Sequence, residues 1–345
     1  MKLILLMAGF GKRMRPHTWS KPKPLVGLAG KPALDHVLDM VAGLNIEEYI
    51  FVVGWLGEQI EAYVTQQHPH LQVRYIQQTE LLGQAHALWL CREFVAGPLA
   101  ILFVDTLMEA DLSGLDRLPA DGVALVKRVP DPRRFGVVEL DEQGYISRFI
   151  EKPSSLENNN VVIGFYYVKD GPELMRRCGE LMDRRIQTKG EYYLADALTL
   201  MVQAGAKLVA QEVAVWEDCG KPETTLHANR WLLETRCDNS AEAVRPGVVV
   251  IPPVYIAPSA TVDQSVIGPY VSIGEGCHIE RCVIRDSILE AGVRARDLVL
   301  DQALIGDDAA LVGQPQRLNV GGSSTLGTDY LGLLEEEEEE EEEEE

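Results

Sequence analysis

A six-residue repeat restricts the fold of residues 250–312 more than any other feature of the sequence. Aliphatic residues recur there about every six positions, often with glycine or alanine next to them, as at Ile256, Val262, Ile267, Ile273 and Ile279. In a β-helix each hexapeptide forms one flat side of a coil, and three sides complete the coil. We therefore predict a short left-handed β-helix of about three to four coils over residues 246–320.

Residues 1–236 follow two other patterns, which predict a separate domain. Continuous apolar runs predict strands at 3–7, 49–53 and 99–104, and we expect further strands at 122–126, 137–140, 145–150 and 161–168. Helical spacing of apolar residues predicts helices at 33–44, 58–65, 84–94, 172–182, 193–203 and 223–236. Strands that are buried on both faces and separated by helices are typical of α/β proteins. We predict a Rossmann-like α/β domain with a mixed, mainly parallel sheet.

The charge of the chain excludes some classes of partner. The formal net charge is −21, and the run Glu335–Glu345 contributes eleven of these charges. We expect residues 321–345 to be a disordered tail, because like charges repel and nothing there can be buried. The remaining moderately acidic body does not attract nucleic acid or anionic membranes in bulk. An anionic ligand must therefore be held by a local basic cluster.

Location is predicted from what the sequence does not contain. The apolar N-terminal run is interrupted too early for a signal peptide, and no run approaches the roughly 18 apolar residues of a membrane span. The six cysteines form no CxxC pair that would indicate a zinc site. We expect a cytoplasmic protein with reduced thiols and no membrane partner.

A basic, glycine-containing loop follows the first apolar run. Residues 8–23 contain two glycines and five cations: Gly9, Gly11, Lys12, Arg13, Arg15, Lys21 and Lys23. Glycines at a strand end permit positive φ and let backbone N–H groups approach phosphate oxygens. The spacing fits neither the P-loop nor the dinucleotide fingerprint. Prolines on both sides of Lys23 stiffen the chain, so we interpret residues 8–23 as a triphosphate-binding loop.

The order A-G-x-G-x-R-[ML]-x-P, followed by P-K-P-L and G-K-P, resembles the sugar nucleotidyltransferase family. In particular it resembles glucose-1-phosphate thymidylyltransferases of the long form with a short β-helix, and the resemblance extends to about residue 320. It implies an enzyme that forms an NDP-sugar and pyrophosphate from dTTP or UTP and a sugar 1-phosphate. The nucleotide-binding residues that it implies in the loop are Ala8, Gly9, Gly11, Lys12 and Arg13. Lys12 stands where the family usually has threonine.

Gln78 and Gly83 are candidates for base recognition. A side-chain amide can hold the edge of a planar base, while a glycine lets the base lie against backbone. Read alone, this segment is better explained as a helix cap, and only the resemblance assigns it to thymine or uracil. Because Gln84 replaces a common threonine, dTTP and UTP both stay open.

Two aspartates are candidates for metal binding. Asp105 lies just past an apolar strand, at the edge of the sheet where ligands bind in open α/β folds. A carboxylate there suits Mg²⁺ that bridges phosphates. Val104 stands where the family usually has glycine. The resemblance implies Asp218 as the second ligand and Mg²⁺ as the cofactor, with Glu217 as a solvated neighbour.

The resemblance also implies the residues that bind the sugar phosphate. They are Gly136, Glu151, Lys152, Asn159 and Glu191. Without the resemblance, adjacent Glu151 and Lys152 are the charge pair of an exposed hairpin.

The implied reaction needs no covalent intermediate, because catalysis by positioning and charge stabilisation suffices. Arg13 would face the departing pyrophosphate, Lys23 the α-phosphate and Lys152 the sugar phosphate, with Asp105 and Asp218 holding the metal. Two alternatives stay open: a non-catalytic regulatory or assembly subunit, and a bifunctional enzyme whose β-helix is an acyltransferase. We expect a homo-oligomer, and the sequence leaves the sugar unidentified.

Overall fold

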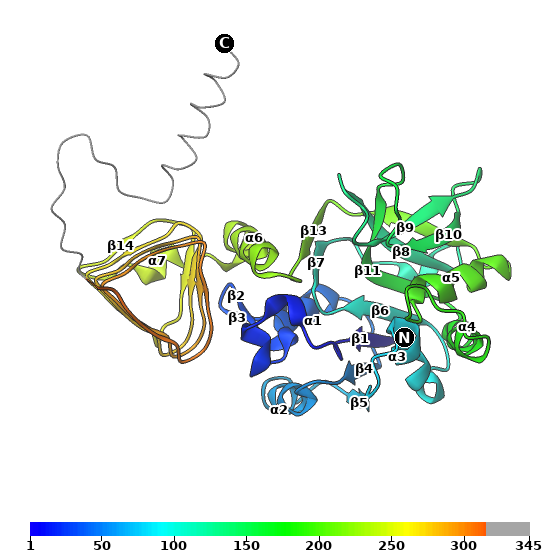
Figure 1. The fold of residues 1–345 in the computed structure, drawn as a ribbon, viewed down its shortest axis with the longest axis horizontal. Helices are drawn as coiled ribbons and strands as arrows, with labels where there is room; N and C mark the ends of the chain where they lie inside the picture. The colour runs from blue at the N-terminus through cyan, green and yellow to red at the C-terminus, as the bar shows by residue number, and fades with distance from the viewer. Residues whose placement is uncertain (315–345) are drawn as a thin grey trace, which may run out of the picture. The chain divides into compact units, whose positions relative to one another are not determined.

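The computed structural model describes residues 1–314, and a nine-stranded mixed sheet forms the centre of their N-terminal part (Figure 1). The strands are β1 (Lys2–Leu6), β4 (Glu48–Val53), β5 (Val73–Gln77), β6 (Leu99–Phe103), β8 (Gly122–Arg128), β9 (Gly136–Leu140), β10 (Ile146–Glu151), β11 (Asn160–Val168) and β12 (Leu208–Glu212). The order is β10-β9-β11-β6-β1-β4-β5, and β8 pairs with β11 and β12. Strands β5, β4, β1 and β6 are parallel, whereas β11 runs antiparallel to its neighbours. The predicted α/β fold is confirmed.

The helices agree with the predicted segments to within a few residues at most ends. They are α1 (Ala33–Val41), α2 (Gly57–Gln67), α3 (Gln84–Leu90), α4 (Gly171–Asp183), α5 (Leu194–Gln203), α6 (Pro222–Leu232) and the short α7 (Ser240–Ala243). Two predicted helices change type before their predicted ends. The segment 84–94 finishes as a 3-10 helix at Arg92–Phe94, and the segment 223–236 continues as a π-helix at Leu233–Cys237. Among the described residues, no helix is both long and apolar enough to cross a membrane.

The predicted hexapeptide β-helix is also confirmed. Its strands form three four-stranded sheets, one for each flat side seen in Figure 1. The first side is β14 (Val249–Val250), β17 (Val266–Ile267), β20 (Val283–Arg285) and β23 (Val299–Asp301). The second is β15 (Val254–Ile256), β18 (Val271–Ile273), β21 (Ile288–Leu289) and β24 (Leu304–Ile305). The third is β16 (Thr261–Asp263), β19 (His278–Glu280), β22 (Arg294–Arg296) and β25 (Ala310–Val312).

Aliphatic residues of successive coils stack inside the β-helix. Ile256 lies opposite Ile273, which lies opposite Leu289, and all three are buried. The domain bounds 1–236 and 246–320 stay predictions. The predicted tail over 321–345 and the end of the second range lie outside the described residues.

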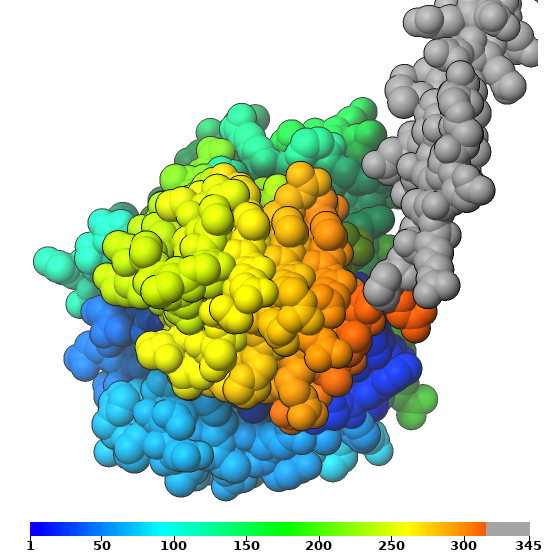
Figure 2. Space-filling view, turned by 90° about the vertical axis from the view of Figure 1, so that its left-hand side faces the viewer, coloured from blue at the N-terminus to red at the C-terminus, as the bar shows by residue number. Residues whose placement is uncertain are grey.

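One side of the β-helix packs against the N-terminal part within the compact unit Met1–Leu311. Ser272 donates a hydrogen bond to Asn229 of α6 over 2.7 Å, and Arg230 pairs with Asp286. Both partners on the β-helix are buried. Figure 2 shows N-terminal residues, in blue, beside the last coils, in orange.

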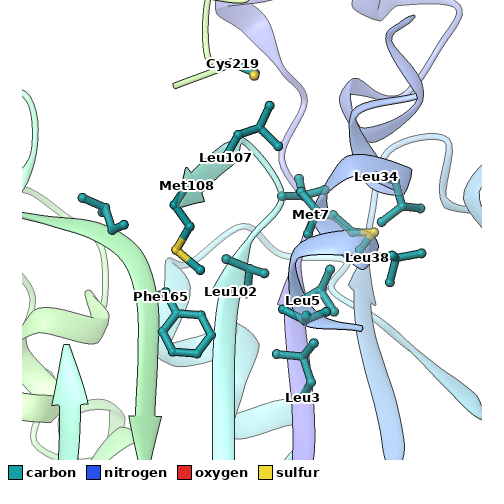
Figure 3. Close-up of a cluster of buried hydrophobic side chains, with 14 of the residues drawn as sticks. Leu3, Leu5, Met7, Leu34, Leu38, Leu102, Leu107, Met108, Phe165 and Cys219 are labelled. Carbon is teal, nitrogen blue, oxygen red and sulfur yellow. The ribbon is translucent and has the colours of Figure 1, made fainter. Parts of the chain in front are cut away.

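Strand β1 shows why the first apolar run is continuous. Leu3 and Leu5 face one hydrophobic cluster, whereas Ile4 faces a second cluster on the opposite side of the sheet, and all three are fully buried. Side chains alternate along a strand, so a strand covered on both faces must be apolar at every position. Figure 3 shows Leu3 and Leu5 packed near Leu34 and Leu38 of α1.

A short two-stranded ribbon was not predicted from the sequence. Strand β7 (Thr106–Glu109) pairs antiparallel with β13 (Val215–Asp218), and Thr106 lies opposite Asp218. The ribbon begins directly after Asp105. It therefore brings together two aspartates that are far apart in the sequence.

Candidate active site

Two neighbouring pockets lie at the carboxyl ends of β1 and β6. This edge of a parallel sheet is the usual position of a ligand site. The first pocket has a volume of about 420 Å³ and the second of about 680 Å³. Four residues line both pockets, namely Arg13, Gln84, Phe103 and Asp105. The pockets share this wall, so two ligands can lie side by side with Arg13 and Asp105 between them.

The loop after β1 lines the first pocket and depends on Gly11. This residue has φ +60°, and a Cβ atom there would lie 2.9 Å from Cγ2 of Thr18. The hydroxyl of Thr18 donates a hydrogen bond over 2.8 Å to the carbonyl oxygen of Gly11, which holds the turn closed. Gly9 differs from our expectation, because its φ is not positive. Gly9 lines the first pocket, and a Cβ atom at this position would meet nothing within 4 Å.

The cations of the loop separate into two groups. Lys12, Arg13 and Lys23 line the first pocket, and Arg13 also lines the second. Arg15 lines neither pocket, and Lys21 forms ion pairs with carboxylates of the β-helix. Arg15 and Lys21 belong to the predicted triphosphate-binding loop but lie outside both pockets. Within residues 1–314 no carboxylate lies within ion-pair distance of Arg13.

Lys23, Asp105 and Asp218 form a charged cluster at the shared wall. The Nζ atom of Lys23 lies 2.6 Å from Oδ2 of Asp105. Burial acts to raise the pKa of Asp105, but the charges of Lys23 and Arg13 outweigh it and hold that pKa below its usual value. Burial and the nearby charge of Asp105 raise the pKa of Asp218. The cluster therefore favours the ionised form of Asp105 and disfavours the ionised form of Asp218.

This carboxylate pair fits a divalent cation. Carboxylate oxygens are the ligands that Mg²⁺ prefers, and Mg²⁺ commonly takes only one or two of them together with substrate phosphates. In the described part of the chain, no group of three or more His, Cys, Asp or Glu residues is arranged to hold a metal ion. A cation between Asp105 and Asp218 would remove the repulsion that raises the pKa of Asp218. A Cβ atom at Gly220 would lie 2.8 Å from Oδ1 of Asp218 and 2.9 Å from Nη2 of Arg13, so a side chain there would displace one of these two charged groups.

Gln78 and Gly83 both line the first pocket. The amide nitrogen of Gln78 donates to the carbonyl oxygen of Gly83 over 3.1 Å and lies 3.2 Å from Nδ1 of His86. With its N–H groups turned to the protein, the carbonyl oxygen of Gln78 is the atom that can accept a hydrogen bond from a ligand. Gly83 has another reason to be glycine, because a Cβ atom there would lie 2.4 Å from the carbonyl oxygen of Tyr192.

The second pocket contains three of the residues predicted for the sugar phosphate: Gly136, Glu151 and Lys152. Burial raises the pKa of Glu151. Burial acts to lower the pKa of Lys152, but the hydrogen bond to the Tyr193 hydroxyl, 2.9 Å long, and nearby carboxylates raise it. Lys152 therefore stays cationic at the mouth of this pocket.

Two predicted sugar contacts do not lie in the second pocket. Asn159 is exposed and lines neither pocket. Glu191 lines the first pocket instead. Every predicted site residue except Asn159 therefore lines one of the two pockets. Glu191 lines the first pocket rather than the second, where the other sugar-phosphate candidates lie.

The structure adds residues that sequence reasoning missed. Arg134, Trp216 and Lys221 line the second pocket, and Gln84, considered from the sequence only as a replacement for threonine, lines both. Arg133 also lines this pocket, although its guanidinium pairs with Asp131. Arg134 and Lys221 stand beside predicted motifs, so a search for cations near those motifs would have found them.

Comparisons with known proteins agree with this architecture. The family model described as nucleotidyl transferase matches residues 2–235, and the model described as GlmU-like, C-terminal hexapeptide matches residues 224–311. The glucose-1-phosphate thymidylyltransferase of Streptomyces griseus is 28% identical over 341 residues, which cover 92% of this chain and 95% of that protein. The low-salt glycan biosynthesis nucleotidyltransferase Agl11 of Haloferax volcanii is 30% identical over an alignment of 361 positions, which spans 94% of this chain and 99% of that protein.

Among solved structures, the crystal structure of UDP-glucose pyrophosphorylase complexed with UDP-glucose superposes with a TM-score of 0.60. The superposition covers 68% of this chain and 99% of that chain at 20% identity. At that identity the likeness concerns the fold alone.

Proposed function

The chain belongs to the nucleotidyl transferase family, and from that premise we propose that it joins dTTP or UTP to a sugar 1-phosphate such as glucose 1-phosphate. The observation that carries the proposal is the pair of pockets that share Arg13 and Asp105. The first pocket, with the loop after β1 and Gln78, suits a nucleoside triphosphate. The second, with Glu151 and Lys152, suits the sugar phosphate. The products are an NDP-sugar and pyrophosphate.

In the proposed reaction a phosphate oxygen of the sugar 1-phosphate attacks the α-phosphorus of the triphosphate. The new P–O bond forms as the bond from the α-phosphorus to the bridging oxygen breaks, and pyrophosphate leaves with that electron pair. Lys152 holds the attacking phosphate, and Lys23 reduces the charge of the α-phosphate. Arg13 balances the charge that develops on the leaving pyrophosphate. Fixed cations supply this stabilisation without reorganisation during the reaction.

Sugar nucleotidyltransferases generally use divalent metal ions, and we propose Mg²⁺ for this chain. Asp105 and Asp218 would hold the ion, because they are paired carboxylates beside the wall that both pockets share. When bound, the ion supplies positive charge to the phosphate oxygens. Removal of divalent ions with a chelator should therefore stop turnover.

The test is pyrophosphate release over a matrix of the four common nucleoside triphosphates against several sugar 1-phosphates, with Mg²⁺ present. We expect turnover with dTTP or UTP and with at least one hexose 1-phosphate. Release from no pair would contradict the proposal and favour the non-catalytic subunit. A parallel assay of acyl transfer from an acyl-CoA tests whether the β-helix adds a second reaction.

Replacing Gln78 with alanine should weaken binding of the pyrimidine nucleotide. Loss of the hydrogen bond to the base raises the KM for dTTP or UTP about 10-fold and leaves the KM for the sugar 1-phosphate unchanged. The matched control is Gln77→Ala, because this exposed neighbour lines neither pocket. Steady-state kinetics with each substrate varied in turn would show the effect. Equal KM values in the two variants would contradict the assignment of Gln78.

We also propose that the chain forms a homo-oligomer through the first side of the β-helix. Valines stack in register along the outside of this side, at Val249, Val266, Val283 and Val299. Three of them are exposed, and Val299 retains 77% of its accessible surface. The third side instead exposes His278 and Arg294. A stacked apolar column on one open side is typical of a protein interface.

Replacing Val283 with aspartate should break this oligomer. An unpaired charge buried at the interface is costly, so the dissociation constant rises at least about 10²-fold. Light scattering coupled to size exclusion measures the mass of the variant beside Arg294→Asp on the third side, which should keep the native mass. A wild-type chain that is monomeric, or two variants of equal mass, would contradict this interface.

A further inference from the structure

A buried carboxylate of the β-helix reaches the basic loop. Glu290 follows β21 and retains only 5% of its accessible surface. Its Oε1 atom accepts a hydrogen bond from the backbone N–H of Gly27, and its Oε2 atom lies 3.2 Å from Nζ of Lys21. Lys21 precedes and Gly27 follows the two prolines, Pro22 and Pro24, that flank Lys23.

The next coil adds further contacts to the same segment. Lys21 also pairs with Asp307, so its ammonium group lies between two carboxylates of the β-helix. A Cβ atom at Gly306 would lie 3.3 Å from Nδ1 of His17. The β-helix thus contacts the loop at His17, Lys21 and Gly27 rather than at one point.

These contacts enclose the residue that we assign to the α-phosphate. Lys23 lies two residues after Lys21 and four before Gly27, in a 3-10 helix at Lys23–Leu25. Prolines at 22 and 24 fix φ on both sides of it, so little motion can be absorbed between the anchors. Holding Lys21 and Gly27 therefore limits where the Lys23 ammonium can lie, 2.6 Å from Asp105.

We propose that Glu290 is a positioning residue, through which the β-helix holds the loop 21–27 so that Lys23 faces the phosphate under attack. On this reading, which rests on the proposed function, the β-helix is a structural part of the active site. Glu290 touches no substrate itself and lines neither pocket. A small displacement of a catalytic group from a remote change can lower a rate by up to about 10²-fold.

The test compares Glu290→Ala with Glu290→Gln in the full chain. In the alanine variant Gly27 loses its acceptor and Lys21 keeps only Asp307, so we expect kcat to fall at least about 10-fold. The KM for the sugar 1-phosphate should stay within about two-fold, since the second pocket is untouched. Glutamine still presents an oxygen to Gly27, so this variant should recover most of kcat. Partial unfolding would also lower the apparent kcat at unchanged KM, so a control variant and a readout independent of turnover separate positioning from stability.

Asp286→Ala is the matched control. Like Glu290, Asp286 is a buried carboxylate of the β-helix that pairs with a cation of the N-terminal part. Its partner, however, is Arg230, near the C-terminal end of α6. Its loss weakens the same junction without touching the loop. We expect a lowered melting temperature, with kcat near that of the wild type.

Hydrogen exchange of the segment 21–27 gives a readout that does not depend on turnover. Loss of the acceptor should speed exchange at the amide of Gly27 about 10-fold in Glu290→Ala, and Asp286→Ala should leave it unchanged. The inference is overturned if exchange there is unaffected, if Asp286→Ala lowers kcat as much, or if Glu290→Gln recovers nothing. A wild-type chain that turns over no substrate pair contradicts the proposed function instead, while the exchange still reports on Glu290.

Discussion

Replacing Asp218 with alanine is expected to lower kcat at least about 10²-fold, which is the effect of removing a major electrostatic group from a catalytic site. Asp218 shares the charged cluster with Asp105, and burial and the charge of Asp105 raise the pKa of Asp218. A single remaining aspartate holds Mg²⁺ more weakly, so the variant should also need a higher Mg²⁺ concentration for half-maximal rate. Pyrophosphate release at saturating substrates, titrated with Mg²⁺, measures both quantities.

Glu217→Gln is the control for this substitution. Glu217 precedes Asp218 on β13, but its carboxylate faces His227, whose Nδ1 lies 2.6 Å away, and it lines neither pocket. We expect kcat and the Mg²⁺ requirement to stay within about two-fold of the wild type. If Asp218→Ala is equally active, the metal assignment is wrong.

The fold could be predicted because each region repeats one simple pattern. Continuous burial of Leu3, Ile4 and Leu5 follows from a sheet covered on both faces. The six-residue spacing from Ile256 to Ile273 follows from the flat sides of the β-helix. Such patterns involve residues that are close in the sequence, so they can be recognised without knowledge of distant contacts.

The ribbon of β7 and β13 could not be predicted in the same way. Each strand has four residues, and their pairing joins segments that are far apart in the sequence. From the residues alone Asp105 could be placed at a ligand-binding edge, but Asp218 depended on the resemblance. The pairing of Thr106 with Asp218 explains physically why the two carboxylates meet.

The direction in which a side chain points could not be predicted from the sequence either. Lys21 and Lys23 have nearly the same sequence surroundings, yet Lys23 faces Asp105 and Lys21 faces the β-helix. The buried Glu290 decides this, and nothing near Lys21 in the sequence reveals it. The position of Asn159 outside both pockets could not be predicted either, because its spacing from Gly164 does not fix which surface of the sheet edge it occupies.

Arg13→Ala is the second substitution with a large expected effect. Arg13 is the one residue among the predicted phosphate contacts that lines both pockets and lies close to Asp218, as the crowding at Gly220 indicates. Its charge should stabilise the leaving pyrophosphate more than the bound triphosphate, because negative charge grows there as the bond breaks. We expect kcat to fall at least about 10²-fold and the KM for the triphosphate to rise less than about 10-fold.

Arg15→Ala separates this role from a general loss of positive charge. Arg15 lies two residues further along the same loop, is exposed, and lines neither pocket. Both substitutions remove one cation from the same loop, so long-range attraction of the triphosphate changes by a similar amount in each. A position-specific role predicts that kcat stays within about two-fold of the wild type in Arg15→Ala. Parallel losses in the two variants would mean that the loop acts through its total charge, and the assignment of Arg13 to the leaving group would fall.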